Sequence, residues 1–564
     1  MVPAVRPPLD LGPIDRLLKL ADTLAGAWGA RALTCTTRGQ ERAMLRMFGV
    51  AGIDRTGRPL AAEVVERFIG DRLDRLAAGV SLPFAAALVE YDLTPQELAL
   101  DIASGAVDLA LEAEVLRDPG RRAAAEEAAR RLTAAGLERI DANRTARLEL
   151  LDLIGDAERP WLGTALRAPG APTAIREVAA LVEGGVDVVQ VSVPAVRELA
   201  EWLHDEGTDV PYWRPRPGPG SPAPTDPDEQ APSGSQRGLA AIRQALDGAA
   251  AERRSYARLA TVCLPLAAPE QALVAAFERV DLVVADAMAE IFDGNVDPDR
   301  ALADQAHAHR LLARSGASVL IGAGPLVVAP DLARGVPSSG ATRAGRALAL
   351  QVVGAALARR DGIPAERLLL GALPAWLIDE RDPTAAAIAQ VAVRAAIFDG
   401  HSLSFAEPQP AGRSAERWPP ILAALLPLAP STGLIVRTAR AGSGSGSGTD
   451  AGAGGSGGTG AGEIDGLARS TRAVVAVARE VAASVGPLAP RGAALAFARD
   501  TVAAALVTLE RLASEGWPSL VGEWPGGAAR DRLGSDGVVE RTDTFDPFVP
   551  AADAGSSSRA SGPR

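Results

Sequence analysis

Acidic residues that follow β-branched runs are the side chains in this sequence best placed for chemistry. Asp286 follows the run VDLVVA at 280–285, and Glu290 lies one helical turn further along. Such runs are typical of buried strands, and in a parallel α/β barrel the carboxyl ends of the strands bind ligands. Gly322 and Gly324 belong to the turn after a second run, SVLIG at 318–322. We expect these four residues on one rim, although Asp286 could simply cap the next helix.

Other motifs predict less. Residues 322–324 lack the third glycine of a dinucleotide-binding fingerprint. Residues 454–458 fit the G-x-S-x-G pattern of a nucleophile elbow, but no strand precedes them and no helix follows them. His307 and His309 are two positions apart, so on a helix they point to different sides and indicate no metal site.

Lysine is almost absent from the chain. Of its 58 basic residues only Lys19 is a lysine. A GC-rich genome, which favours arginine codons, accounts for this composition. Whatever the cause, a chain with no lysine after residue 19 is not expected to supply its own Schiff-base lysine. If such a chain uses pyridoxal phosphate, another chain must donate the amine.

Composition excludes several classes of protein. With 47% hydrophobic and 23% charged residues the chain is globular, and a net charge of −12 without a basic stripe disfavours nucleic-acid binding. No run of 18 uncharged apolar residues predicts a membrane helix, and the N-terminus has prolines and acids where a signal peptide needs an apolar core. Two cysteines, Cys35 and Cys263, exclude a disulfide framework or a cysteine-based zinc site. We expect a cytoplasmic protein.

Short β-branched runs alternate with helical patterns between about residues 155 and 435, after a region that we expect to be helical throughout. The runs are 186–193, 258–264, 280–285, 318–322 and 367–371. This alternation predicts a parallel sheet with right-handed crossovers, which an open doubly wound sheet or a closed barrel would satisfy. The missing dinucleotide fingerprint and a length of about 280 residues favour a (β/α) barrel of the TIM type. The expected division is a helical region 1–154, the barrel 155–437 with a proline-rich loop 214–236, a Gly/Ser linker 438–462, helices 463–526 and a tail 527–564.

Several segments, in order along most of the chain, resemble one known family. They include ERAMLRMFG at 41–49, TPQELALDIASG at 94–105, the run 186–193, the stretch 258–305 and DPFV at 546–549. The chain thereby resembles the larger (α) subunit of lysine 5,6-aminomutase and its ornithine-acting relatives.

The resemblance implies a (β/α) barrel that holds pyridoxal phosphate at the carboxyl ends of its strands. It also implies a smaller β subunit, which carries adenosylcobalamin and the lysine of the internal aldimine. The reaction of the family is a radical 1,2-shift of a terminal amino group, in which the cofactors supply the chemistry and the protein orients and shields them.

The sequence departs from this family at the positions expected to hold the cofactor. An arginine and a serine of the family align with Val193 and Glu198, next to Arg197, and further polar residues align with Leu264, Ala289, Gly294 and Leu326. The candidate pocket residues are therefore Arg197, Glu198, Asp286, Glu290, Gly322 and Gly324. Two hypotheses stay open: an aminomutase α subunit with a rebuilt pocket, and a non-catalytic relative that keeps the barrel as a binding or assembly module.

Overall fold

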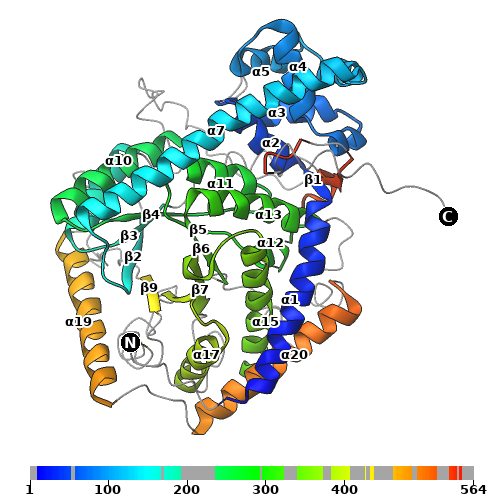
Figure 1. Ribbon diagram of the computed structural model, residues 1–564. Helices are drawn as coiled ribbons and strands as arrows, with labels where there is room; N and C mark the ends of the chain where they lie inside the picture. Colours follow the sequence, from blue (N-terminus) through cyan, green and yellow to red (C-terminus); the bar gives the residue numbers. More distant parts are fainter. Residues whose placement is uncertain are drawn as a thin grey trace, which may run out of the picture.

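A closed barrel of eight parallel strands forms the centre of the protein (Figure 1). The computed structural model describes residues 9–52, 58–166, 171–191, 236–292, 295–322, 339–372, 383–406, 426, 432–436, 461–485, 492–517, 532–542 and 545–548. The barrel strands are β2 (Trp161–Leu166), β3 (Val188–Val191), β4 (Arg258–Val262), β5 (Leu282–Val284), β6 (Ser318–Ile321), β7 (Leu368–Ala372), β8 (Ser402–Ala406) and β9 (Thr432–Val436). Each strand pairs with the next, and β9 closes the ring on β2. The predicted TIM-type barrel is confirmed.

The strands alternate between an inner and an outer apolar surface, as the period of two along a strand requires. On β3, Val188 belongs to the cluster that fills the barrel, whereas Val189 and Val191 belong to the core between strands and helices. The inner cluster takes side chains from seven strands: Trp161, Val188, Ala260, Leu282, Leu320, Leu369 and Leu434. At this level the barrel is a packed core and not a pore.

Helices that follow the strands cover the outside of the barrel. They are α8 (Ala171–Glu183), α10 (Gln236–Arg253), α11 (Ala268–Phe277), α12 (Ala287–Phe292), α13 (Pro298–Ser315), α15 (Gly340–Arg360) and α17 (Pro383–Ile397), with the 3-10 helix η3 (Ala365–Arg367) before β7. The side chain of Asp297 accepts a hydrogen bond at the start of α13, and Gly316 ends this helix in a left-handed conformation. The five strand-like runs of the sequence correspond to β3–β7, whereas they do not predict β2, β8 and β9.

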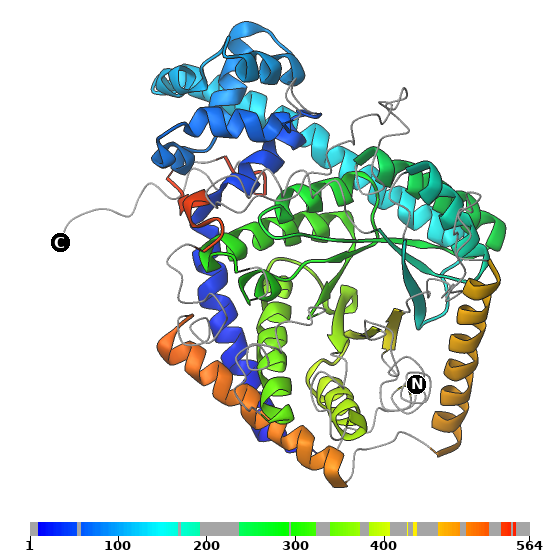
Figure 2. The same cartoon turned by 180° about the vertical axis from the view of Figure 1, so that it is seen from behind.

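The N-terminal region is helical with one short strand. Its first helix packs against barrel helices, and the helices after it form a lobe with an apolar core of their own. The elements of this region are α1 (Leu11–Leu33), β1 (Cys35–Thr37), α2 (Arg38–Met47), α3 (Leu60–Ile69), η1 (Leu73–Ala78), α4 (Ser81–Tyr91), α5 (Pro95–Ser104), α6 (Leu109–Val115) and α7 (Pro119–Ile154). The expectation of helices throughout is wrong at β1, because β1 pairs antiparallel with β10 (Val538–Glu540) near the C-terminus. The long helix α7 runs from this lobe to the barrel helices α11 and α13 (Figures 1 and 2).

Two long helices and a short folded segment follow the barrel. These are α19 (Ala461–Val485), α20 (Gly492–Glu515) and η5 (Ser535–Gly537), which leads into β10. Among the described helices, α20 is long and apolar enough to cross a membrane by length and composition, although no uncharged run predicted one. Its residues Ala498, Val502 and Leu509 are buried in the main core, and α20 packs against α1, α15 and α17. A core helix has this same length and composition.

The two low-complexity segments lie almost wholly outside the described residues. Of the proline-rich loop 214–236 only Gln236 is described, as the first residue of α10. Of the Gly/Ser linker 438–462 only the last two residues are described, at the start of α19.

Candidate functional site

Asp286 ties together two neighbouring strand ends at the carboxyl end of the barrel. It follows β5, is only 7% exposed, and its Oδ2 accepts a 2.8 Å hydrogen bond from the backbone N–H of Gly322, which follows β6. Its Oδ1 accepts a 2.9 Å bond from the N–H of Met288 in the first turn of α12. Burial raises the pKa of the Asp286 carboxyl, and these backbone N–H groups oppose that effect. Asp286 therefore caps α12 and also fixes the turn after β6.

The turn at Gly322 rests on a hydrogen-bonded side-chain pair behind the strands. Gly322 has φ +76°, and a Cβ at this position would overlap the amide nitrogen of Gln351 on α15. That amide donates to the carbonyl oxygens of Ile321 (3.1 Å) and Gly371 (2.8 Å), so it bridges the ends of β6 and β7. Its Oε1 accepts a 2.9 Å bond from Nε of Arg394 on α17.

Arg394 is a buried cation at this end of the barrel. It is 2% exposed, and it donates to the neutral side chains of Gln351 and Gln390 and to the Gln390 carbonyl. Burial lowers the pKa of Arg394 to about 10. No carboxylate among the described residues pairs with it. The sequence offered no signal for this residue, because an arginine on a helix is ordinarily solvent-exposed.

Glu290 lies behind the rim, between α12 and α13. It is 4% exposed, and its Oε1 accepts a 2.5 Å hydrogen bond from Nε2 of Gln305. Burial raises the pKa of Glu290 well above its usual range, and the nearby Asp304 carboxylate raises it further. The Glu290 carboxyl therefore holds its proton more strongly than an exposed glutamate does. Its side chain contacts helix α13.

The described inner surface at the mouth of the barrel is mainly apolar. A residue two positions after a member of the inner cluster points to the same, inner side of the barrel. Four such half-buried residues lie at the mouth: Gln190, Val262, Val284 and Val436. Gln190 lies in register with Ala165 and Ala260 on the flanking strands. Within the described part of the chain its amide has no hydrogen-bond partner. The alternation of the run VDVVQVSV, which puts Gln190 on the same face as Val188, was the signal that could have identified it.

The described strand ends do not supply the anchors that the resemblance implies. None of the barrel strands ends in an arginine or lysine. Among the described residues, none that directly follows a barrel strand is cationic either. Leu264 and Ala289, at positions where the resemblance leads us to expect polar residues, are apolar, and the N–H of Leu264 donates to Oε1 of Gln271. A phosphate needs charged donors or free N–H groups, so these residues do not fit one. The described strand ends therefore do not form a site for the phosphate of pyridoxal phosphate.

The remaining candidate positions cannot be placed. Arg197, Glu198, Gly324 and the aligned Val193, Gly294 and Leu326 all lie outside the described residues. Within the described ranges, no group of three His, Cys, Asp or Glu side chains could hold a metal ion.

A cavity in the described region lies away from the barrel mouth. Its volume is about 20 Å³, and its lining includes Gln40, His307 and Arg541, from the N-terminal lobe, α13 and the C-terminal segment. This volume accommodates a water molecule and is too small for an amino acid or a cofactor. The barrel mouth is therefore the better candidate site.

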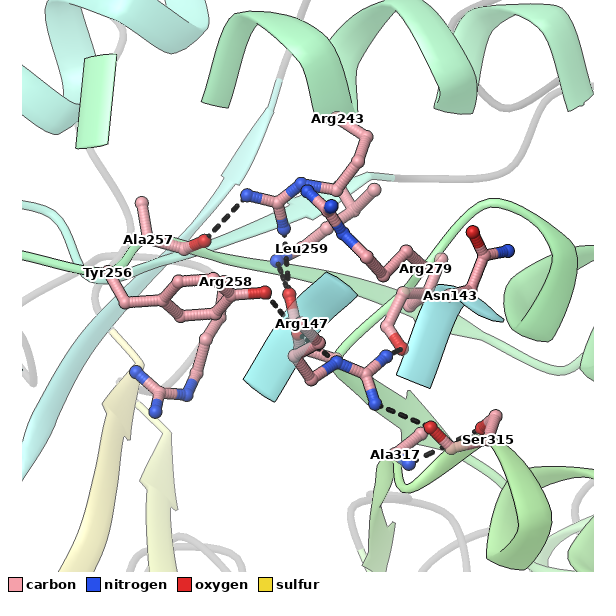
Figure 3. Close-up of polar contacts among 12 residues, drawn as sticks. Asn143, Arg147, Arg243, Tyr256, Ala257, Arg258, Leu259, Arg279, Ser315 and Ala317 are labelled. Carbon is pink, nitrogen blue, oxygen red and sulfur yellow. Dashed lines mark hydrogen bonds and ion pairs between the residues drawn. The ribbon is translucent and has the colours of Figure 1, made fainter. Parts of the chain in front are cut away.

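The opposite, N-terminal end of the barrel holds a dense ion cluster around Asp281. Its carboxylate contacts Nε of Arg147 (2.8 Å), Nη1 of Arg243 (2.8 Å) and the hydroxyl of Tyr256 (2.8 Å), and accepts from the N–H of Leu259 (2.9 Å). Figure 3 shows Arg147 and Arg243 reaching this point from α7 and α10. The two arginines lower the pKa of Asp281 against the effect of burial. Charge at this end of a TIM barrel contributes to stability.

Comparisons with known proteins agree on one family. Residues 8–411 match the family described as the D-lysine 5,6-aminomutase TIM-barrel domain of alpha subunit. The lysine 5,6-aminomutase alpha subunit of Fusobacterium nucleatum is 27% identical over 332 residues, which are 59% of this chain and 58% of that protein. The subunit of the same name from Acetoanaerobium sticklandii is 27% identical over 337 residues, 60% of this chain and 59% of that protein. The alignments thus span under three fifths of these relatives.

A structural comparison adds little. Dihydropteroate synthase from Anaplasma phagocytophilum, solved with 6-hydroxymethylpterin-monophosphate, is 14% identical and has a TM-score of 0.33. The superposition covers all of the dihydropteroate synthase chain and 57% of this protein. A likeness at this level bears on neither fold nor function.

Proposed function

Because this chain belongs to the D-lysine 5,6-aminomutase family, with the TIM-barrel domain of its alpha subunit, we propose that it is the barrel subunit of an aminomutase-type isomerase. The proposed reaction is the radical 1,2-shift of an amino group on an amino acid. The match over residues 8–411 and the closed eight-stranded barrel support the subunit assignment. Since the alignments span under three fifths of the curated relatives, the activity of the whole protein is part of the proposal.

The position of the single lysine is the observation that carries the proposal. Lys19 is exposed on α1, which packs on the outside of the barrel against α13, α15 and α20 (Figure 1). Its amine therefore cannot reach the barrel mouth. A chain of this family whose single lysine lies away from the barrel mouth fits a heteromer in which a small partner subunit supplies the Schiff-base lysine and binds adenosylcobalamin.

Pyridoxal phosphate is the second proposed cofactor, by family membership. When bound it would supply a conjugated π system that can accommodate the unpaired electron during amine migration. The chain's own described contributions would be the shape of the barrel mouth, the fixed turn at Gly322 and the free amide of Gln190.

A non-catalytic barrel is the second candidate function. Leu264 and Ala289 at aligned contact positions favour it, because neither side chain can hold a phosphate or hydrogen-bond to an aromatic nitrogen. In that case the barrel would be a binding or assembly module within the same kind of complex.

Reconstitution with a partner separates these two functions. The chain is co-purified with a small cobalamin-binding protein, pyridoxal phosphate is added, and the absorbance is scanned. An internal aldimine band at about 410–430 nm, with a borohydride-stable adduct on the partner, supports the aminomutase. A stable complex without the band supports the non-catalytic module.

The chain alone provides the matched control. Incubation with pyridoxal phosphate and borohydride should label at most Lys19 and the N-terminal amine, because the chain has no other lysine. Removing the first residues through Lys19 should abolish the lysine label and leave only the new N-terminal amine as a site. A labelled barrel residue in the truncated chain would overturn the proposed division of labour.

A further inference from the structure

The C-terminal segment 532–540, here called the strap, lies across the loop that follows β5. The N–H of Leu533 donates to the carbonyl of Asn295 (3.1 Å), and the N–H of Asp297 donates to the carbonyl of Leu533 (3.0 Å). Val296 and Leu533 form a parallel bridge between these segments. The strap thereby joins the connection between α12 and α13 like a short extra strand.

Arg532 binds the same loop through its side chain. Its Nη1 donates to the carbonyl of Val296 (2.8 Å), and its Nη2 donates to the carbonyl of Ile291 (3.1 Å). Ile291 lies in the last turn of α12, where helix carbonyls lack partners within the helix. One guanidinium thus holds the C-terminal end of α12 and the residues that follow it, across 241 positions of sequence.

The strap also contacts the loop that follows β4. At Gly534, with φ +76°, a Cβ would overlap the side chain of Leu266. Nη1 of Arg300 donates to the carbonyl of Gly537 (2.9 Å), and its Nη2 lies 3.4 Å from the carbonyl of Leu266. Both loops at this part of the rim are therefore packed against the C-terminal segment.

These two loops carry residues of the candidate site. The loop after β4 contains Leu264, and the element after β5 contains Asp286 and Ala289. We propose that Arg532 is a positioning residue of the barrel's ligand-binding rim, which fixes α12 and the loop after it through two backbone carbonyls. The proposal rests on the proposed function only in taking this end of the barrel as the ligand-binding end.

The strap has other attachments, so the contribution of Arg532 can be measured separately. β10 pairs with β1 over Cys35–Thr37, and Arg300 holds Gly537 independently. Removal of the Arg532 side chain should leave the strap in place and loosen α12 and its loop.

Hydrogen exchange on the full chain tests this. In Arg532→Ala we expect amides in 287–292 and 295–297 to exchange at least about tenfold faster, with the N–H of Val296, which donates to the carbonyl of Glu290, as the most direct reporter. Arg532→Lys keeps one donor group without the planar fork, so we expect an intermediate effect of about threefold. Exchange within about twofold of wild type in both variants would overturn the proposal.

Arg367→Ala is the matched control. Arg367 is also half-buried and donates to a backbone carbonyl, that of Ala313 (3.1 Å), but it precedes β7 at the other end of the barrel. It should leave exchange in 287–292 and 295–297 unchanged. If it accelerates those amides as much as Arg532→Ala does, the effect is a general loss of stability and the positioning role is wrong.

Cofactor retention gives a second readout. In the reconstituted complex, Arg532→Ala should weaken pyridoxal phosphate binding by about fivefold or more, Arg532→Lys should restore part of it, and Arg367→Ala should have no effect. Equal affinity in wild type and Arg532→Ala would overturn the positioning role. If no partner yields the aldimine band, the proposed function fails, while hydrogen exchange still decides the role of Arg532.

Discussion

At Gly322 both the backbone conformation and the packing limit the choice of side chain. Its φ of +76° is unfavourable for other residues, and Gln351 occupies the space that a Cβ would need. Gly322→Ala should therefore destabilise the protein by about 2–4 kcal/mol, through backbone strain and a displaced Gln351 amide. Urea unfolding monitored by circular dichroism measures the change.

Gly248 provides the control for this substitution. It lies within α10, and no atom lies within 4 Å of where a Cβ would be. Gly248→Ala should be neutral or stabilise by up to about 1 kcal/mol, because alanine favours the helix. Similar destabilisation by both substitutions would contradict the role assigned to the Gly322 turn.

Glu290 should make the stability of the protein fall as pH rises. Its pKa in the folded protein is raised far above the value of about 4.3 in an unfolded chain, so folding favours the protonated acid. The contribution of this acid is complete below the unfolded pKa and is lost as pH rises through the folded pKa. Glu290→Gln, which is always neutral, should gain stability relative to wild type in thermal unfolding as pH rises above the unfolded value of about 4.3.

Glu97 tests the sign of this effect. It is exposed in the capping box of α5, and its hydrogen bonds with Thr94 lower the pKa of the carboxyl. Glu97→Gln should show no gain over wild type as pH rises through the same range. A flat difference between Glu290→Gln and wild type would show that Glu290 is ionised in the folded protein.

At the scale of elements, the Asp281 cluster joins α7 and α10 to the N-terminal ends of β4 and β5. Arg147 also donates to the carbonyls of Val280 and Ser315, both at 2.7 Å. Asp281→Asn leaves Arg147 and Arg243 buried without their carboxylate and should cost about 3–5 kcal/mol. Arg147→Met leaves Asp281 its remaining donors and should cost less, about 1–3 kcal/mol. Chemical denaturation of both variants gives this order directly.

An exposed ion pair calibrates that measurement. Glu90 and Arg121 are about half exposed and 3.1 Å apart. Glu90→Gln should change stability by no more than about 0.5 kcal/mol. If Arg147→Met cost more than Asp281→Asn, the backbone carbonyls would matter more than the carboxylate.

The elements show which features of the sequence predict structure. Strands β3–β7 lie in β-branched or leucine-rich runs between clear helices, and such runs indicate buried parallel strands. β2 (WLGTAL) and β8 (SLSFA) contain Gly, Ser or Ala where a strand usually has β-branched residues, so composition does not indicate them. β1 and β10 have three residues each and exist only as a pair of distant segments. Pairing at such a separation has no local signal.

The sequence also predicts only part of the candidate site. The approach of Asp286 to Gly322 follows from strand order, because adjacent parallel strands bring their carboxyl ends together. Glu290 was expected at the rim and contacts α13 instead, because one helical turn separates it from Asp286. Gln351 and Arg394 act from helices behind the strands. Their contacts depend on packing between layers, which periodicity does not specify.

At the scale of the whole molecule, the two ends of the chain hold the helical lobe to the barrel. The folded C-terminal segment reaches β1 through β10, and Arg541 donates to the carbonyl of Thr34 and contacts Asp546. The ring of Phe548 packs edge-on against His307 of α13. Figures 1 and 2 both show this segment at the junction between the lobe and the barrel.

Truncation should therefore affect the lobe more than the barrel. A chain ending at Trp517 lacks β10, the only partner strand that the described residues offer to β1, together with the contacts of Arg541 and Phe548. We expect its thermal midpoint to fall by about 5–10 °C, because several partly buried hydrogen bonds are lost together. Limited proteolysis should cut first near β1, where the backbone has lost its pairing, and leave the barrel helices α10, α11 and α15 protected. A chain ending at Phe548 keeps all these contacts and should match the full chain in both assays. Equal protection of residues 33–38 in the two truncated chains would show that the lobe is held by its helices alone, through α7 and α2 against α11 and α13.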